Sequence, residues 1–160
     1  MIQAIRETNF DAYIETKANR IDANTPATRI RHLVKFINDL DEAVFYAYAA
    51  VENIHNRYTL MAFNYNAIPN VFSGKINLIP AGYFKYEVYE VSWISEDVVL
   101  SAATAPATET TVLPVNDENG VVEGLVAIGI LYLGEKAGSE EVQYTEYEAP
   151  ASTNTIYYGQ

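Results

Sequence analysis

The chain has 160 residues, a length typical of one domain, and its 21 acidic residues outnumber its 10 basic ones to give a net charge of −11. The absence of cysteine excludes thiol catalysis, iron–sulfur clusters and cysteine-based zinc sites, and is typical of a protein made in a reducing cytoplasm. No apolar run approaches the ~20 residues that span a bilayer, and the first residues lack the layout of a signal peptide. We therefore expect a protein that is made in the cytoplasm and has no membrane partner.

The negative charge is concentrated in the second half of the chain. Residues 1–85 hold nine basic and eight acidic side chains, a net charge of +1, whereas residues 86–160 hold one basic and thirteen acidic side chains, a net charge of −12. An acidic surface repels phosphate groups, which argues against nucleic acid as a partner of this half. The same charge keeps a concentrated protein soluble until a partner covers it.

Alternation of apolar and polar residues with a period of two recurs along the chain and predicts β-strands. In the longest example, residues 83–93, Phe84 and Val88 face one way while Lys85 and Glu87 face the other. Turn signals rich in Pro, Gly, Asn and Asp separate the segments. The predicted strands cover residues 10–16, 29–37, 43–50, 57–65, 75–79, 83–93, 125–132, 141–147 and 153–158.

One part of the chain supports two interpretations. Residues 33–53 are rich in alanine and could form a single helix. Against this, Val44, Phe45 and Tyr46 prefer strands, and the sequence around Asp39 breaks the helical stripe. We favour a β-hairpin with its turn at residues 38–41, followed by a loop at residues 52–56.

About nine short strands separated by turn signals predict an all-β fold, an antiparallel β-sandwich of the Ig-like or jelly-roll-like type. We expect a single β domain over residues 1–160. Residues 1–28 are a candidate N-terminal arm, and residues 149–160 are a candidate C-terminal strand or arm. The uncharged, alternating end of the chain, with Ile156, Tyr157 and Tyr158 as candidate interface residues, could complete the sheet of its own domain or pair with a neighbouring subunit.

The sequence offers little for catalysis or for binding a cofactor or a metal. The two histidines, His32 and His55, lack a second histidine or a cysteine at ligand spacing, and no serine lies in a Gly-x-Ser-x-Gly elbow. Pairs of acidic residues such as Asp117 and Glu118 fall in predicted turns, where solvated carboxylates are common. We predict no catalytic, cofactor-binding or metal-binding residues, and therefore no enzyme.

Aromatic residues give an alternative functional hypothesis, a ligand-binding module. The chain has 13 tyrosines and one tryptophan, and tyrosine is favoured both in β-sheets and at interfaces. Tyr83, Tyr89 and Trp93 could line one face of the strand at residues 83–93. If these rings form an exposed platform, they could stack on sugar rings, and the chain would then be a carbohydrate- or receptor-binding β-sandwich module.

Four segments form a distinctive set in this order: residues 71–90, residues 129–132, residues 142–147 and residues 153–159. Together they resemble structural proteins from tailed bacteriophages of the kind found in phages of Bacteroidetes and marine bacteria, and the resemblance covers roughly residues 30–159. It implies a non-enzymatic virion component, an accessory capsid, decoration or neck protein, which is assembled in the host cytoplasm. Its partners would be other virion proteins, in many symmetric copies.

Overall fold

The structure, a computed structural model, describes residues 1–138, in which the regular secondary structure is mostly β-strand. The predicted all-β class is therefore confirmed. Three short 3-10 turns, η1 (Lys17–Asn19), η2 (Ala27–Arg29) and η3 (Val71–Ser73), are the helical elements of these residues, and none of them is long enough to cross a membrane. The strands are β1 (Ile2–Ile5), β2 (Phe10–Ile14), β3 (Ile30–Asn38), β4 (Val44–Tyr48), β5 (Val51–Ile54), β6 (Thr59–Tyr65), β7 (Lys75–Ile76), β8 (Gly82–Ser92) and β9 (Val121–Gly134).

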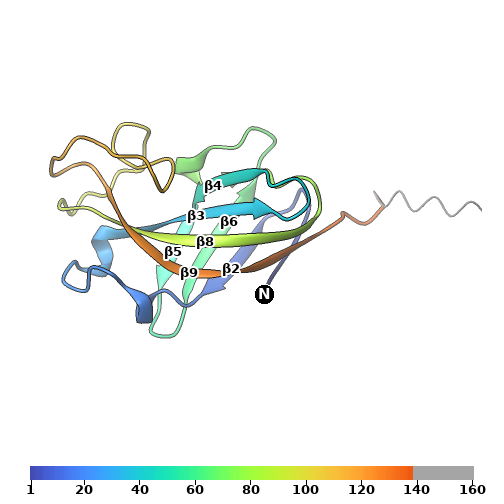
Figure 1. The fold of residues 1–160 in the computed structure, drawn as a ribbon, viewed down its shortest axis with the longest axis horizontal. Coiled ribbons are helices and arrows are strands. Elements are labelled where there is room, and N and C mark those ends of the chain that lie inside the picture. The colour runs from blue at the N-terminus through green and yellow to red at the C-terminus, as the bar shows by residue number, and fades with distance from the viewer. Residues whose placement is uncertain (139–160) are drawn as a thin grey trace, which may run out of the picture.

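The strands form two sheets. The larger sheet has the order β1-β9-β8-β3-β4, and the smaller one has the order β2-β6-β5, with the short β7 also paired to β6. Figure 1 shows the larger sheet, with its long and curved β8 and β9, in front of the smaller sheet. Neighbouring strands are antiparallel except for β1 beside β9 and β7 beside β6, which are parallel.

The main hydrophobic core lies between the two sheets. Alternate residues of each strand point into it, because successive side chains of a strand lie on opposite faces. Phe36 from the larger sheet and Phe63 from the smaller sheet are both fully buried, and their ring centroids are 5.6 Å apart. Phe10 on β2 stacks on Phe63 at 5.2 Å and meets Phe36 edge-on at 6.4 Å. This aromatic trio joins the two sheets.

The hairpin predicted for residues 33–53 is confirmed, and the helix interpretation is wrong. β3 and β4 pair antiparallel with Phe36 opposite Phe45, and a turn at residues 39–43 connects them. The loop predicted at residues 52–56 is wrong in its first half, because residues 51–54 form β5. The segment is poor in strand-forming residues, but it pairs with β6 through a tight turn. In this turn the His55 N–H donates to the Tyr58 carbonyl at 2.9 Å.

The N-terminal segment is part of both sheets. The sequence leaves open an arm at residues 1–28, whereas in the structure β1 lies at the edge of the larger sheet and β2 at the edge of the smaller one. β1 pairs with β9 along Leu131–Gly134 alone, so it covers the last part of that long strand. The strands predicted at residues 141–147 and 153–158 lie outside the described residues.

The segment between β8 and β9, residues 93–120, folds over one end of the larger sheet and builds a second hydrophobic core there (Figure 1). Trp93, at 2% exposure, packs with Leu33, Tyr48 and Ala105 in this core. The indole N–H of Trp93 donates to the Thr104 carbonyl at 3.3 Å. The Tyr48 hydroxyl donates to the Pro106 carbonyl at 2.7 Å, so polar groups of the core are paired as well.

Candidate protein-interaction surface

Exposed apolar side chains lie on the outer side of the larger sheet, the side turned away from the main core. Residues opposite each other on neighbouring strands share a face, and this register places Tyr83 beside Tyr132 and Lys85 beside Ile130. Ile128 and Ile130 are 61% and 51% exposed, although isoleucine is usually buried. We call this surface the outer face; its apolar members are Ile37, Val44, Tyr83, Ile128, Ile130 and Tyr132.

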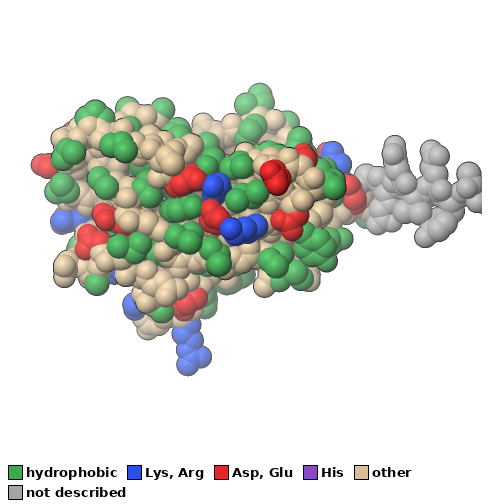
Figure 2. Space-filling view, viewed as in Figure 1, with side chains coloured by type: hydrophobic (Ala, Val, Ile, Leu, Met, Phe, Trp, Pro, Cys, Tyr) green, Lys and Arg blue, Asp and Glu red, His purple; other side chains and the backbone are tan. Residues whose placement is uncertain are grey.

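Charged side chains lie in the middle of this face and neutralise one another, as the red and blue groups in Figure 2 show. The Lys35 ammonium is 2.6 Å from the Glu109 carboxylate, and the Tyr46 hydroxyl donates to the same carboxylate at 2.5 Å. The Lys85 ammonium is 2.6 Å from the Glu87 carboxylate. Because these charges are already paired within the chain, the outer face needs no ionic partner.

The contacts shift the pKa values of this charged cluster in predictable directions. The hydrogen bond from Lys85, helped by one from Tyr89, lowers the pKa of Glu87. Burial acts against ionisation of Glu109, but hydrogen bonds from Lys35 and Tyr46 outweigh it and lower the pKa of that carboxyl. The hydrogen bond to Glu109 raises the pKa of Lys35 to about 12. Lys35, Glu87 and Glu109 are therefore ionised at neutral pH, and the Lys35–Glu109 ion pair joins the loop that holds Glu109 to β3.

Acid should weaken this attachment. A carboxyl whose pKa is lowered by folding stabilises the folded state above its unfolded pKa, near 4.5, and that stabilisation is lost as the pH falls through the lower folded value. Lys35→Met should therefore cost about 1 kcal/mol at pH 7 and much less at pH 3. Urea unfolding at both pH values measures this. Lys17→Met is the control, because the Lys17 ammonium bonds the neutral Asn56 amide; equal costs at both pH values for Lys35→Met would contradict the assignment.

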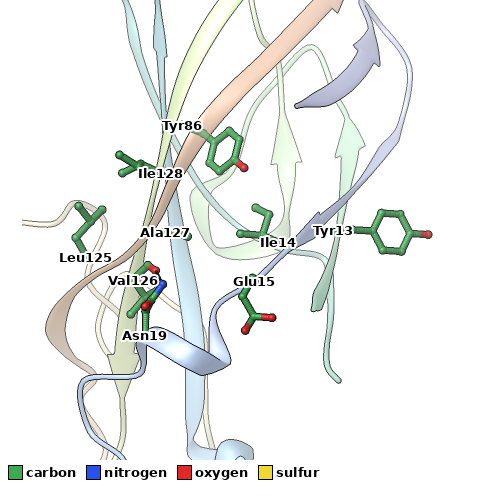
Figure 3. A pocket seen from close by; sticks show the side chains of 9 residues that line it. All are labelled: Tyr13, Ile14, Glu15, Asn19, Tyr86, Leu125, Val126, Ala127 and Ile128. Atoms are coloured by element: carbon green, nitrogen blue, oxygen red, sulfur yellow. Dashed lines mark hydrogen bonds between the residues drawn. The ribbon is translucent and has the colours of Figure 1, made fainter. Parts of the chain in front are cut away.

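A groove runs beside the outer face, between the edge of β9 and the edge of β2 (Figure 3). Its volume is about 610 Å³, and it lies beside the part of β9 that precedes Leu131, where β1 begins, so that β1 leaves this part of β9 uncovered. In Figure 3, the side chains of Ile14, from the β2 side, and Tyr86, from the β8–β9 side, point toward each other, whereas Ile128 points away to the outer face, and the Glu15 carboxylate lies at one end. The Asn19 amide, which also lines the groove, donates to the Val126 carbonyl at 3.0 Å.

The two histidines are held by structural contacts. The Nδ1 atom of buried His32 is 2.6 Å from the Glu52 carboxylate, which also accepts from the His32 backbone N–H at 3.1 Å. This pair joins β3 in one sheet to β5 in the other. The ring of His55 packs on Tyr58 with centroids 4.8 Å apart. Within residues 1–138 no three His, Asp or Glu side chains are arranged to hold a metal ion.

The structure does not bring Tyr83, Tyr89 and Trp93 together as an exposed platform. Tyr83 is 54% exposed and its ring lies 5.0 Å from that of Tyr132, at an angle of 50°. Tyr89 is half-buried, and its hydroxyl donates to Glu87 at 2.7 Å. Trp93 lies in the second core because residues 93–120 fold over it. The candidate interface residues Ile156, Tyr157 and Tyr158 lie outside the described residues.

Sequence reasoning missed the outer face, although a signal for it was present. Residues 125–132 read Leu-Val-Ala-Ile-Gly-Ile-Leu-Tyr, with apolar side chains at odd and even positions alike. A strand with apolar residues on both faces is covered on both faces. In the structure the core covers Leu131, whereas Ile128 and Ile130 remain exposed on the other side. No protein-family model matches the chain, and neither a curated protein nor a solved structure is significantly similar to it.

Proposed function

We propose that this chain is a non-enzymatic structural protein of a tailed-phage virion that packs its outer face against other proteins, including copies of itself. We also propose that its two sheets form a β-sandwich of the Ig-like or jelly-roll-like type. The observation that carries the proposal is the exposure of the neighbouring apolar side chains Ile128 and Ile130 on the outer face. Exposed apolar surface costs free energy in water, and a partner that covers it removes that cost.

The composition of the outer face supports a protein partner. Tyr83 and Tyr132 lie at its edge, and tyrosine is enriched in protein interfaces because its ring is apolar and its hydroxyl is polar. The charges in the middle are paired within the chain, so covering them leaves no single ion without a partner. A face of this kind is suited to association in many copies, which agrees with the virion role that the resemblance implies.

The virion assignment has a direct test. Particles of the phage that encodes this chain, purified on a density gradient, should contain the protein at a fixed ratio to the major capsid protein, as measured by quantitative mass spectrometry. A replication enzyme of the same phage is the control for adhering material. Absence of the chain from the particles, or an amount no greater than that of the enzyme, would show that the protein is not a virion component.

The role of the outer face is tested by adding charge to it. The double variant Ile130→Asp/Tyr83→Asp should lower the molar mass of the protein in solution to that of a monomer, because two carboxylates must be desolvated for the face to pack. Ile130→Asp also sets a carboxylate opposite Lys85, so the monomer should keep its fold. Val115→Asp, on a 93% exposed side chain, is the control and should leave the mass unchanged. Light scattering measures the mass and circular dichroism the fold.

A carbohydrate- or receptor-binding module is the second candidate, and the exposed Tyr83–Tyr132 pair is the feature that favours it. The two rings are inclined by 50°, so a flat sugar ring could stack on one of them but not on both. The buried Trp93 removes the widest ring from the platform. Binding to a glycan array that is lost in Tyr83→Ala would favour this candidate over the structural one.

A further inference from the structure

The edge of β9 is open along part of its length. β9 extends over Val121–Gly134, but β1 pairs with it along Leu131–Gly134 alone, and no other strand within residues 1–138 pairs with this edge. The Gly134 carbonyl accepts from the Arg6 N–H on the β1 side. Because alternate residues of a strand direct their backbone groups to the same edge, Ile128 presents its N–H and C=O there.

The open edge ends at defined points. Asn19 occupies the Val126 carbonyl at one end, and Met1 and Ile2 lie at the other. The four residues between these points, residues 127–130, span about 13 Å at 3.3 Å per residue, which accommodates a short added strand. The groove described above lies along this same edge, so an added strand would place alternate side chains into it, over Ile14 and Tyr86.

The end of the chain has the composition that such an edge requires. Residues 153–158, Thr-Asn-Thr-Ile-Tyr-Tyr, carry no charge, include β-branched and aromatic residues, and follow Ala149-Pro-Ala-Ser152. Glu15 is the single charged residue among those that line the groove. An uncharged strand enters such a groove without desolvating a charge of its own, whereas the acidic residues 135–148 could not do so.

We propose that residues 153–158 of one copy add as a strand to the open edge of β9 in a second copy. The inference rests on the proposed function, because it adds a second contact, beside the outer face, between the copies whose packing that function requires. Twenty-two residues follow Gly138. The chain leaves β9 at Gly134, at the end of the strand that β1 covers and away from the open stretch of its edge. A neighbouring copy can therefore be reached without the segment turning back past β1.

Disulfide trapping tests the proposal, because the chain has no cysteine and each introduced thiol is unique. One full-length variant carries Ile128→Cys, and each of six others carries one cysteine at a position from 153 to 158. The Ile128→Cys variant is mixed with each tail variant under mild oxidation, and the yield of disulfide-linked interchain dimer is measured. The yield should be high at alternate positions of residues 153–158, about tenfold above the yield when Val115→Cys replaces Ile128→Cys. Alternation distinguishes a strand from random collision.

Two results would overturn the inference. Yields no higher than the Val115→Cys control at all six positions would show that the segment does not dock at this edge. In variants that carry Ile128→Cys and a tail cysteine in the same chain, the disulfide could form within that chain. If it does, and the mixtures give no interchain dimer, the segment completes its own domain. Deleting residues 149–160 separates the two proposals: if the deletion variant keeps the oligomeric mass of the full chain, the strand exchange is wrong while packing through the outer face stands.

Discussion

Replacing Trp93 with alanine should lower the free energy of unfolding by about 3–5 kcal/mol, the usual cost of removing a large buried aromatic side chain. The indole fills the second core between the larger sheet and residues 93–120, and its N–H bonds the Thr104 carbonyl. A β-carbon on Gly120 would lie 2.5 Å from the Trp93 ring, so the start of β9 also packs closely on the indole. Urea unfolding followed by circular dichroism measures the loss.

Ile94→Ala is the matched control for this prediction. Ile94 is the next residue in the chain, and its side chain is 61% exposed, so the variant should change the free energy of unfolding by less than about 0.5 kcal/mol. In Trp93→Ala, limited proteolysis should cut within residues 93–120 before it cuts the sheets. If Trp93→Ala and Ile94→Ala cost the same, the second core would not contribute to stability.

Phe63→Ala should be comparably costly, at about 3–5 kcal/mol, because Phe63 contacts both Phe10 and Phe36 and connects the two sheets. The truncation leaves a cavity that rigid neighbouring strands can fill only in part. The loss of stability should appear as a lower midpoint of urea unfolding, with an unchanged dependence of the unfolding free energy on urea concentration.

Asn64→Ala, at the next position of β6, is the control, because Asn64 points to solvent. This control measures how much stability is lost when alanine, a poorer strand former, is placed in β6 without removing a core side chain. A Phe63→Ala protein as stable as the Asn64→Ala protein would mean that the sheets are not held together by this aromatic trio.

The parts of the fold that follow from local alternation were predictable, and the parts that depend on distant contacts were not. The β3–β4 hairpin is encoded by its own residues, with strand formers Val44–Tyr46 beside a turn at Asp39. β5 has no such signal, because residues 51–54 become a strand through their pairing with β6. β1 likewise gains its place through β9, more than a hundred residues away.

The same distinction applies to the candidate site. Alternation puts Tyr83 and Tyr89 on one face of β8, but register shifts beside Tyr89 and Glu90 and the return of residues 93–120 over Trp93 decide which rings remain exposed. The sequence shows which residues of β9 are apolar but not which of them other parts of the chain cover. Their exposure depends on which neighbouring strands and loops cover them, and that information comes from the tertiary structure.

The most direct test of the proposed role is the molar mass of the full chain, measured by light scattering over a wide range of protein concentrations. Packing through the outer face predicts an oligomer of defined mass that falls to the monomer in Ile130→Asp/Tyr83→Asp and stays intact in Val115→Asp. A monomer at every concentration, with the same mass in all three proteins, would contradict the claim that this face joins copies of the chain.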